Sequence, residues 1–297
     1  MNLKERIQQL SSLPARFSTM LEQALRVVKD DTQREALCVA ACVISNASWE
    51  RWQGNRPPED NGQEHEWVVF SNIMKIAECE GLNLSDRRIA TAFAFTHDSF
   101  YIPRIMEAQI RDLEERAAKV KDNDPNLAKE LLRRASELRT EKKLQRTKHM
   151  EGGAKNAELL LPQLKDPVDS LSPLLQAKEI DDCVALIKGH DTWKTGEPKP
   201  PGNARLAVVC LEGDALWPLH PLGILADLLR PNEKGETKDM NDLEEWKKQL
   251  RESLKTLLEF RSNWENQAGE KFAGPVSIFR TEEGYRLYLA WREFWNI

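Results

Sequence analysis

Apolar residues recur along most of this chain at intervals of three and four positions, which is the spacing of one face of an α-helix. Alternation at every second position, which is typical of strands, is scarce. The segment from about Asp31 to Trp49 contains the run Ala36–Ile44, which is apolar almost all round and predicts a buried central helix. The segment Arg56–Gly62 then breaks the pattern. We therefore predict an all-α fold.

Two further helices are predicted after this break. The first begins near Glu64 and has His65 in its first turn. Ser85 is a suitable N-cap for the second helix, whose C-terminal end carries His97 and Asp98. Neighbouring residues on a helix point about 100° apart. The side chains of His97 and Asp98 can therefore serve one site only where the helix frays or widens.

A long charged segment follows, from Ile105 to Lys148. It is dense in Glu, Lys and Arg, with leucines spaced along it, and Asp122–Asn126 divides it into two halves. This pattern predicts a charged helical hairpin inserted into the fold. One interpretation is a solvent-exposed hairpin whose helices share only a narrow strip of apolar residues. The other, which stays open, is an arm that binds a partner or a second copy of the chain.

The C-terminal part predicts helices that pack on the rest of the protein. An amphipathic helix is expected from about Asn241, and Thr281 is a suitable cap for a last helix with an aromatic stripe. Such a stripe at helical spacing is typical of a core. The expected organisation is a set of N-terminal helices at 1–56, a central domain at 57–230 with the charged insertion at 105–148, and a C-terminal helical extension at 231–297.

Composition narrows the classes of function. The chain has 43 basic and 48 acidic residues, a net charge of −5, and no strongly basic segment. Stable nucleic-acid binding is therefore not expected, although a small nucleotide stays open as a ligand. Met1–Leu10 is polar where a signal peptide is apolar, and no apolar run reaches the roughly 18 residues of a membrane span. We expect a cytoplasmic protein with no membrane segment.

Cysteine and histidine residues differ in what they indicate. The five cysteines lack CxxC spacing and lie mostly among apolar neighbours, and we expect them to be buried free thiols. Of the five histidines, four fall in short motifs that together suggest one metal site. Imidazoles and carboxylates hold divalent transition metals, and two such metals can share a bridging carboxylate. The candidate ligands are His65, His97, Asp98, His149, His190 and Asp214.

The order of these motifs resembles the HD superfamily of metal-dependent phosphohydrolases, over roughly His65 to Asp227. In members of this superfamily, a first histidine lies at the start of a helix and a His-Asp pair lies at the end of an Ala-rich helix. A later aspartate lies in a motif similar to Ala-Asp-Ala. His65, His97, Asp98 and Asp214 match these positions. The resemblance implies an HD-domain-like helical bundle.

Two further histidines are similar to those of the two-metal HD-GYP branch of this superfamily. The segment His149-x-x-x-Gly153-Ala154 is similar to the motif His-Pro-x-x-Gly-Ala of that branch. His190 is similar to the first histidine of its His-His motif. The chain departs from that branch at three places. Tyr101 stands where a lysine often follows the His-Asp pair, Asp191 replaces the second histidine, and Gly196-Glu197-Pro198 replaces Gly-Tyr-Pro. These departures argue against cyclic di-GMP as the substrate.

The resemblance implies a binuclear site built on the six ligands. Asp98 would bridge two divalent ions of Mn, Fe, Co, Ni or Zn, and a metal-activated hydroxide would attack the phosphorus of a nucleotide or other phosphoester. Asp98 and His97 are the expected catalytic residues. His65, His97 and Asp214 would complete one coordination sphere, and His149 and His190 would bind the second metal.

Substrate contacts are expected from residues near these motifs. Arg104, Lys148, Lys194 and Arg205 are candidates for binding phosphate oxygens. His220 is close to Asp214 in sequence and is either a further substrate contact or a hydrogen-bonded loop histidine. The expected partner is a small phosphorylated substrate, and a homo-oligomer stays open.

Two other functions share the same ligands. The same order of ligands resembles the di-iron oxygenases of the HD superfamily, in which oxygen is a substrate. A third interpretation is a non-catalytic protein that binds a metal or a nucleotide and contacts a partner through the charged hairpin.

Overall fold

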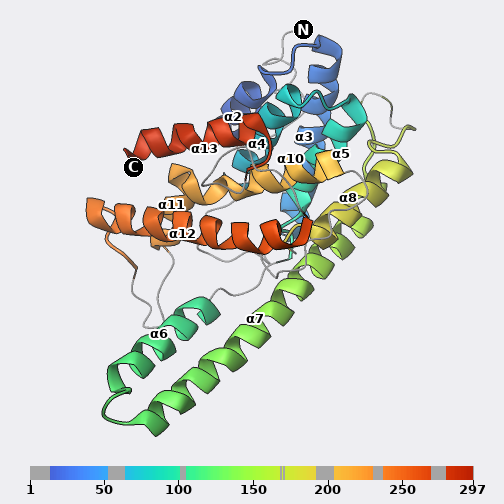
Figure 1. Ribbon diagram of the computed structural model, residues 1–297. Coiled ribbons are helices and arrows are strands. Elements are labelled where there is room, and N and C mark those ends of the chain that lie inside the picture. Colours follow the sequence, from blue (N-terminus) through green and yellow to red (C-terminus); the bar gives the residue numbers. More distant parts are fainter. Residues whose placement is uncertain are drawn as a thin grey trace.

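Helices form the regular secondary structure of the protein, as a computed structural model of it shows (Figure 1). The structure describes residues 14–52, 64–100, 105–167, 169, 171–191, 204–229, 237–268 and 279–296. Within these ranges no strand is present, and Lys165 pairs with Pro173 in an isolated antiparallel bridge. The predicted all-α fold class is confirmed. No helix in the described ranges is both long and apolar enough to cross a membrane.

The helices occur close to the predicted positions. Asp31–Trp52 is the central helix expected from the apolar run, and Glu64–Cys79 begins at the predicted residue. In chain order the helices are α2 (Ala15–Leu25), α3 (Asp31–Trp52), α4 (Glu64–Cys79), α5 (Leu84–Thr96), α6 (Ile105–Val120), α7 (Pro125–Leu160), the short 3-10 helix η2 (Leu161–Gln163), α8 (Ala177–Gly189), α10 (Ala204–Ala215), the short 3-10 helix η3 (Trp217–Leu219), α11 (Pro221–Leu229), α12 (Leu243–Ala268) and α13 (Glu282–Trp295).

The core lies where α3, α4, α5, α8 and α10 pack together. α4 contacts α2, α5 and α10, and α5 contacts α3 and α8. Fully buried rings from α4 and α5 meet at its centre: the rings of Trp67 and Phe95 are 4.7 Å apart, and those of Phe70 and Phe95 are 5.3 Å apart. Burial of such a side chain stabilises the fold by about 1.5–3 kcal/mol. This packing fixes the ends of α4, α5 and α10 relative to one another.

The N-cap of α5 differs from the predicted one. The side chain of Asn83 caps the helix by accepting a hydrogen bond from the backbone N–H of Asp86 at 2.9 Å. Ser85 lies inside the first turn and donates instead to a carboxylate oxygen of Glu179 on α8, at 2.8 Å. Asn and Ser are about equally good caps. The sequence pattern could not decide between two candidates that are two residues apart, and the prediction of Ser85 was wrong.

The charged segment forms a helical hairpin that extends away from the other helices (Figure 1). α6 and α7 pack against each other, and Asp124 caps α7 by accepting from the backbone N–H of Leu127 at 3.0 Å. The expected end of the insertion at Lys148 falls inside α7, which continues without a break to Leu160. The second half of the hairpin and the segment that carries His149 are therefore parts of one helix, α7.

α13 packs on the bundle through α4 and α10. Thr281 caps it as predicted, accepting from the backbone N–H of Gly284 at 2.9 Å. The buried carboxylate of Glu212 on α10 accepts from the backbone N–H and the hydroxyl of Thr281, at 3.2 and 2.5 Å. Burial raises the pKa of Glu212 to about 7. The start of α13 is thus tied to the helix that carries Asp214.

The five cysteines are free, as predicted, and four of them are buried. The prediction of a buried thiol was wrong for Cys79, which is exposed in the last position of α4.

Two adjacent glycines let α7 lie directly on the end of α5. A Cβ atom on Gly153 would stand 2.6 Å from the backbone carbonyl oxygen of His97, which is too close for any side chain. A Cβ atom on Gly152 would collide with Cγ of Phe100, the ring carbon nearest the backbone of a half-exposed side chain. The backbone at His97 is fixed by the helix before it, whereas the side chain of Phe100 can relieve its contact by turning about its Cα–Cβ bond.

We predict that Gly153→Ala destabilises the protein more than Gly152→Ala, its matched control. Overpacking against fixed backbone costs about 1–3 kcal/mol, while alanine within a helix is favoured over glycine by about 0.5–1 kcal/mol. Chemical denaturation of both variants measures the difference. Equal stabilities would contradict the close approach of α7 to His97.

Candidate metal centre

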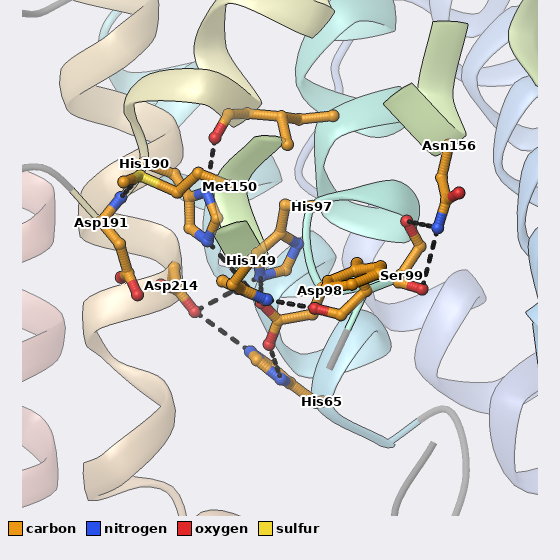
Figure 2. A network of polar contacts seen from close by, with 12 residues as sticks. His65, His97, Asp98, Ser99, His149, Met150, Asn156, His190, Asp191 and Asp214 are labelled. Carbon is orange, nitrogen blue, oxygen red and sulfur yellow. Dashed lines mark hydrogen bonds and ion pairs between the residues drawn. The ribbon is translucent and has the colours of Figure 1, made fainter. Parts of the chain in front are cut away.

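The six predicted ligands come together from five helices (Figure 2). Each lies at or near the end of a helix, apart from one that lies in the inner part of α7. The positions are His65 in the first turn of α4, His97 and Asp98 directly after α5, His149 on α7, His190 directly after α8, and Asp214 as the penultimate residue of α10. The predicted fraying after α5 is present: α5 ends at Thr96, and a turn carries the His-Asp pair.

The carboxylate of Asp98 is at the centre of the cluster, and its two oxygens face different histidines. Oδ2 is 3.2 Å from Nδ1 of His65. Oδ1 faces the other three histidines: Nε2 of His149 at 2.9 Å, Nε2 of His190 at 3.7 Å and Nε2 of His97 at 3.7 Å. One carboxylate therefore reaches all four imidazoles.

A second carboxylate, that of Asp214, lies on one side of the cluster. Its Oδ1 is 3.0 Å from Nε2 of His65 and 3.6 Å from Nε2 of His97. His65 consequently lies between two carboxylates, with one ring nitrogen toward each. Asp214 contributes to the part of the cluster formed by α4 and α5.

These contacts divide the cluster into two groups that share Asp98. His65, His97 and Asp98 form the first group, and Asp98, His149 and His190 form the second; within each, one possible ligand atom per residue lies within 4.8 Å of the others. Imidazole nitrogen and carboxylate oxygen suit Mn, Fe, Co, Ni or Zn. The arrangement offers places for two cations with a carboxylate between them.

Three of the histidines are oriented by backbone carbonyl groups. In each, Nδ1 faces a carbonyl oxygen, which can only accept a hydrogen bond, so Nδ1 carries the proton and the lone pair of Nε2 points into the cluster. This is the tautomer that binds a metal through Nε2. The acceptors are the oxygens of Phe93 and Ala94 for His97, at 3.1 and 3.2 Å, of Ile187 for His190, at 2.7 Å, and of Phe100 for His149.

Nε2 of His97 indicates that the cluster is built for a cation. It is fully buried and has no hydrogen-bond partner among the described residues. The nearest charged atoms are acceptors, Oδ1 of Asp98 and Oδ1 of Asp214, at 3.7 and 3.6 Å. A buried lone pair that faces two carboxylates is costly unless a positive charge lies between them. The residues therefore fit a divalent metal ion, and in its absence a proton.

The pKa values of His65, His97 and Asp98 also favour positive charge within the cluster. Burial lowers the pKa of His65, but its hydrogen bonds to Asp214 and Asp98 together outweigh burial and raise the pKa to about 10. The pKa of His97 is also raised against the effect of burial, chiefly by the charge of Asp98. Burial raises the pKa of Asp98, yet the charge of His97 and the hydrogen bonds from the other histidines hold it well below its usual value.

The members of the cluster differ in their exposure to solvent. His97 and His190 are buried, whereas the side chain of Asp98 is 27% exposed. His65 and His149 flank it, with side chains that are 11% and 12% exposed. The shared carboxylate is therefore the most exposed member of the two groups, while the imidazoles of His97 and His190 are buried.

The structure describes two of the four basic substrate-binding candidates, Lys148 and Arg205. Arg104 and Lys194 lie outside the described residues. Lys148 is exposed and precedes His149 on α7. Arg205 forms an ion pair with Glu80 at 3.2 Å and lies in the first turn of α10. Nine residues of helix separate it from Asp214, which is about 13 Å, so a contact between Arg205 and a ligand at the cluster is not supported.

His220 is a hydrogen-bonded loop histidine in the structure. Its Nδ1 accepts from the backbone N–H of Leu222 at 3.2 Å, at the start of α11. Its ring stacks on Trp217, with centroids 6.2 Å apart. Burial, together with the charge of Lys75, lowers its pKa to about 4. It is not part of either ligand group.

Two residues near the cluster were not singled out from the sequence. Asn156 donates to the carbonyl oxygen of Ser99 at 3.1 Å and so holds the turn that follows Asp98. It lies seven positions after His149, two helical turns along the same face of α7, which is a signal that the sequence offers. Trp217 stacks on His65 with centroids 5.0 Å apart, and it follows Asp214 by three positions.

Comparison with known proteins gives no relative. No protein-family model matches the chain, and no curated protein or solved structure matches it either. Membership of the HD superfamily therefore stays a proposal.

We predict that the metal-free protein loses stability as the pH rises from about 6.5 to about 10. Because folding raises the pKa of His65 from 6.5 to about 10, its contribution to stability is complete below the first value and is lost as the pH passes the second. Thermal denaturation of chelator-treated protein across this range measures the loss, with His65→Gln as the control that should lack it. A melting temperature that is independent of pH in both proteins would contradict the protonated cluster.

Proposed function

We propose that the protein is a metal-dependent phosphohydrolase of the HD type that hydrolyses a nucleotide or another phosphoester. The observation that carries the proposal is the sharing of Asp98 by two groups of ligands. Two cations beside one bridging carboxylate are the arrangement by which many phosphoester hydrolases act. The partly exposed carboxylate of Asp98 would face the substrate.

The residues divide into two coordination sets in this proposal. His65, His97 and Asp214 would hold the first metal, and His149 and His190 would hold the second, with Asp98 between them. Bound divalent metals lower the pKa of coordinated water and offset the negative charge of phosphoryl oxygens. The carbonyl groups that hold Nδ1 keep three of the imidazoles in the required tautomer.

The burial pattern supports a site for chemistry rather than a closed structural metal site. A structural site encloses its ion, whereas a catalytic site keeps a position open to substrate. The bridging carboxylate is the most exposed member of the two ligand groups, and it stays ionised at neutral pH because its pKa is low. Lys148, exposed and next to His149, is the remaining described candidate for binding a substrate phosphate.

The positions of the ligands on the helices support the HD-type assignment. The first histidine lies in the first turn of α4, the His-Asp pair follows the last turn of α5, and the later aspartate is the penultimate residue of α10. The first two positions are the places that the resemblance implies. We propose the central domain at 57–230 as the HD-type unit, with the hairpin inserted between Asp98 and His149.

We predict that Asp98→Asn removes both metals and the hydrolase activity. The variant keeps the shape of the side chain but loses its charge, and even a residue that only supports a metal ligand is worth about 10–100-fold in affinity or activity. Activity should therefore fall by more than about 100-fold. Asp182→Asn is the matched control, because Asp182 is an exposed carboxylate on α8 paired with Lys178.

The measurements are metal content by plasma mass spectrometry, on protein purified without chelator and after reconstitution, and hydrolysis of phosphomonoesters and phosphodiesters under Mn, Fe and Co. We expect about two metal ions per wild-type chain. Iron with oxygen consumption and no hydrolysis would favour a di-iron oxygenase instead. Metal binding without turnover of any kind would favour a binding protein, and full activity of the Asn variant would exclude the proposed site.

A further inference from the structure

One of the four histidines in the cluster is held differently from the others. Nδ1 of His97, His149 and His190 faces a backbone carbonyl oxygen. In the described part of the chain no backbone carbonyl accepts from His65; both of its ring nitrogens face carboxylates, Oδ2 of Asp98 at 3.2 Å and Oδ1 of Asp214 at 3.0 Å. Its hydrogen bonds therefore go to the other ligands and give it no support from outside the cluster.

The ring of Trp217 supplies that support. The indole and the imidazole of His65 lie face to face, with centroids 5.0 Å apart and planes inclined by 17°. The ring of His97 meets His65 edge-on, at 5.2 Å and 90°. A flat partner against the face of an imidazole resists rotation of the ring out of its plane. Trp217 thus does for His65 what a carbonyl group does for the other three histidines.

Trp217 is itself held firmly. The ring of His220 lies parallel to it, with centroids 6.2 Å apart and planes inclined by 9°, and His220 meets Trp291 of α13 at 4.9 Å. The backbone oxygen of Trp217 approaches Gly223 so closely that a Cβ atom there would collide with it. The start of α11 and the last helix therefore fix the indole that faces His65.

The same short segment carries a ligand and the support of another ligand. Asp214 ends α10, and Trp217 begins η3 three positions later. Both act on the first ligand group, through the carboxylate that faces His65 and the ring that stacks on it. The second group, by contrast, is held by carbonyl groups near α5 and α8.

We propose that Trp217 is a positioning residue of the metal centre, which holds the imidazole of His65 by stacking and so controls metal binding at the first ligand group but not at the second. The inference rests on the binuclear site of the proposed function. Trp217 does not bind the metal or the substrate; it acts through His65.

The test compares Trp217→Leu, which removes the flat ring, with Trp217→Phe, which keeps a smaller one. Trp246→Leu is the matched control, because Trp246 is also partly buried but lies on α12 and packs against Trp295. Binding of Co²⁺ is measured by competition with a chelator and by its absorption spectrum, and helical circular dichroism confirms that each variant is folded.

We expect wild type and Trp246→Leu to bind about two ions with the same affinities. Trp217→Leu should bind one ion as before and the other about 10–100-fold more weakly, with a changed spectrum for that ion alone, since this is the range for residues that orient a ligand. Trp217→Phe should recover most of the affinity. A role in folding alone would not weaken one of two sites selectively.

Equal affinities and spectra for wild type, Trp217→Phe and Trp217→Leu would overturn the inference and leave the binuclear site intact. Should the Leu variant not fold, the comparison of wild type with the Phe variant decides in the same way. Wild-type protein that binds no Co²⁺ would overturn the proposed function and this inference with it.

Discussion

The cluster depends on one electrostatic constraint, which is that buried lone pairs of imidazole and carboxylate groups face one another. Asp98 lies among four imidazoles, and Nε2 of His97 faces two carboxylates without a donor of its own. Such a cluster is unstable unless positive charge enters it, as protons or as metal ions. The raised pKa values of His65, His97 and His149 and the low pKa of Asp98 are consequences of the same constraint.

The helices are arranged so that several of their ends meet at the cluster of histidines and carboxylates. The core formed by α3, α4, α5, α8 and α10 fixes where α4 begins and where α5 and α10 end, and so fixes the first ligand group. The second group depends on α7, whose glycines allow it to lie on the turn after α5. Because α7 is a single helix from the hairpin tip to Leu160, the second half of the charged hairpin and His149 belong to one continuous helix.

The sequence predicted the helices and the residues that gather in the cluster better than it predicted how those residues are held. Helical periodicity located α3 and α4, and the residue types of the six ligands pointed to a metal, because both signals are local. The support of His65 by Trp217 depends on packing between segments that are far apart in sequence, which no spacing reveals. Arg205 was expected near the substrate, but the direction of α10 places it at the opposite end from Asp214.

The N-cap of α5 is a second feature that the sequence pattern alone could not predict. Asn83 and Ser85 are equally suitable by type, and the choice between them is made by Glu179 on α8, whose carboxylate takes the serine hydroxyl. The continuity of α7 across Lys148 is a related case, because the helical pattern does not end where the charged composition ends. Composition marks where a segment faces solvent, while helix ends are set by caps and breaks.

The most direct test of the central claim is anomalous X-ray diffraction from crystals grown with Mn²⁺. We expect two anomalous peaks, one on each side of the Asp98 carboxylate, the first beside His65 and His97 and the second beside His149 and His190. The absence of any peak at Asp98 in crystals that hold Mn²⁺ elsewhere would show that the histidine cluster is structural, and would contradict a metal-dependent function.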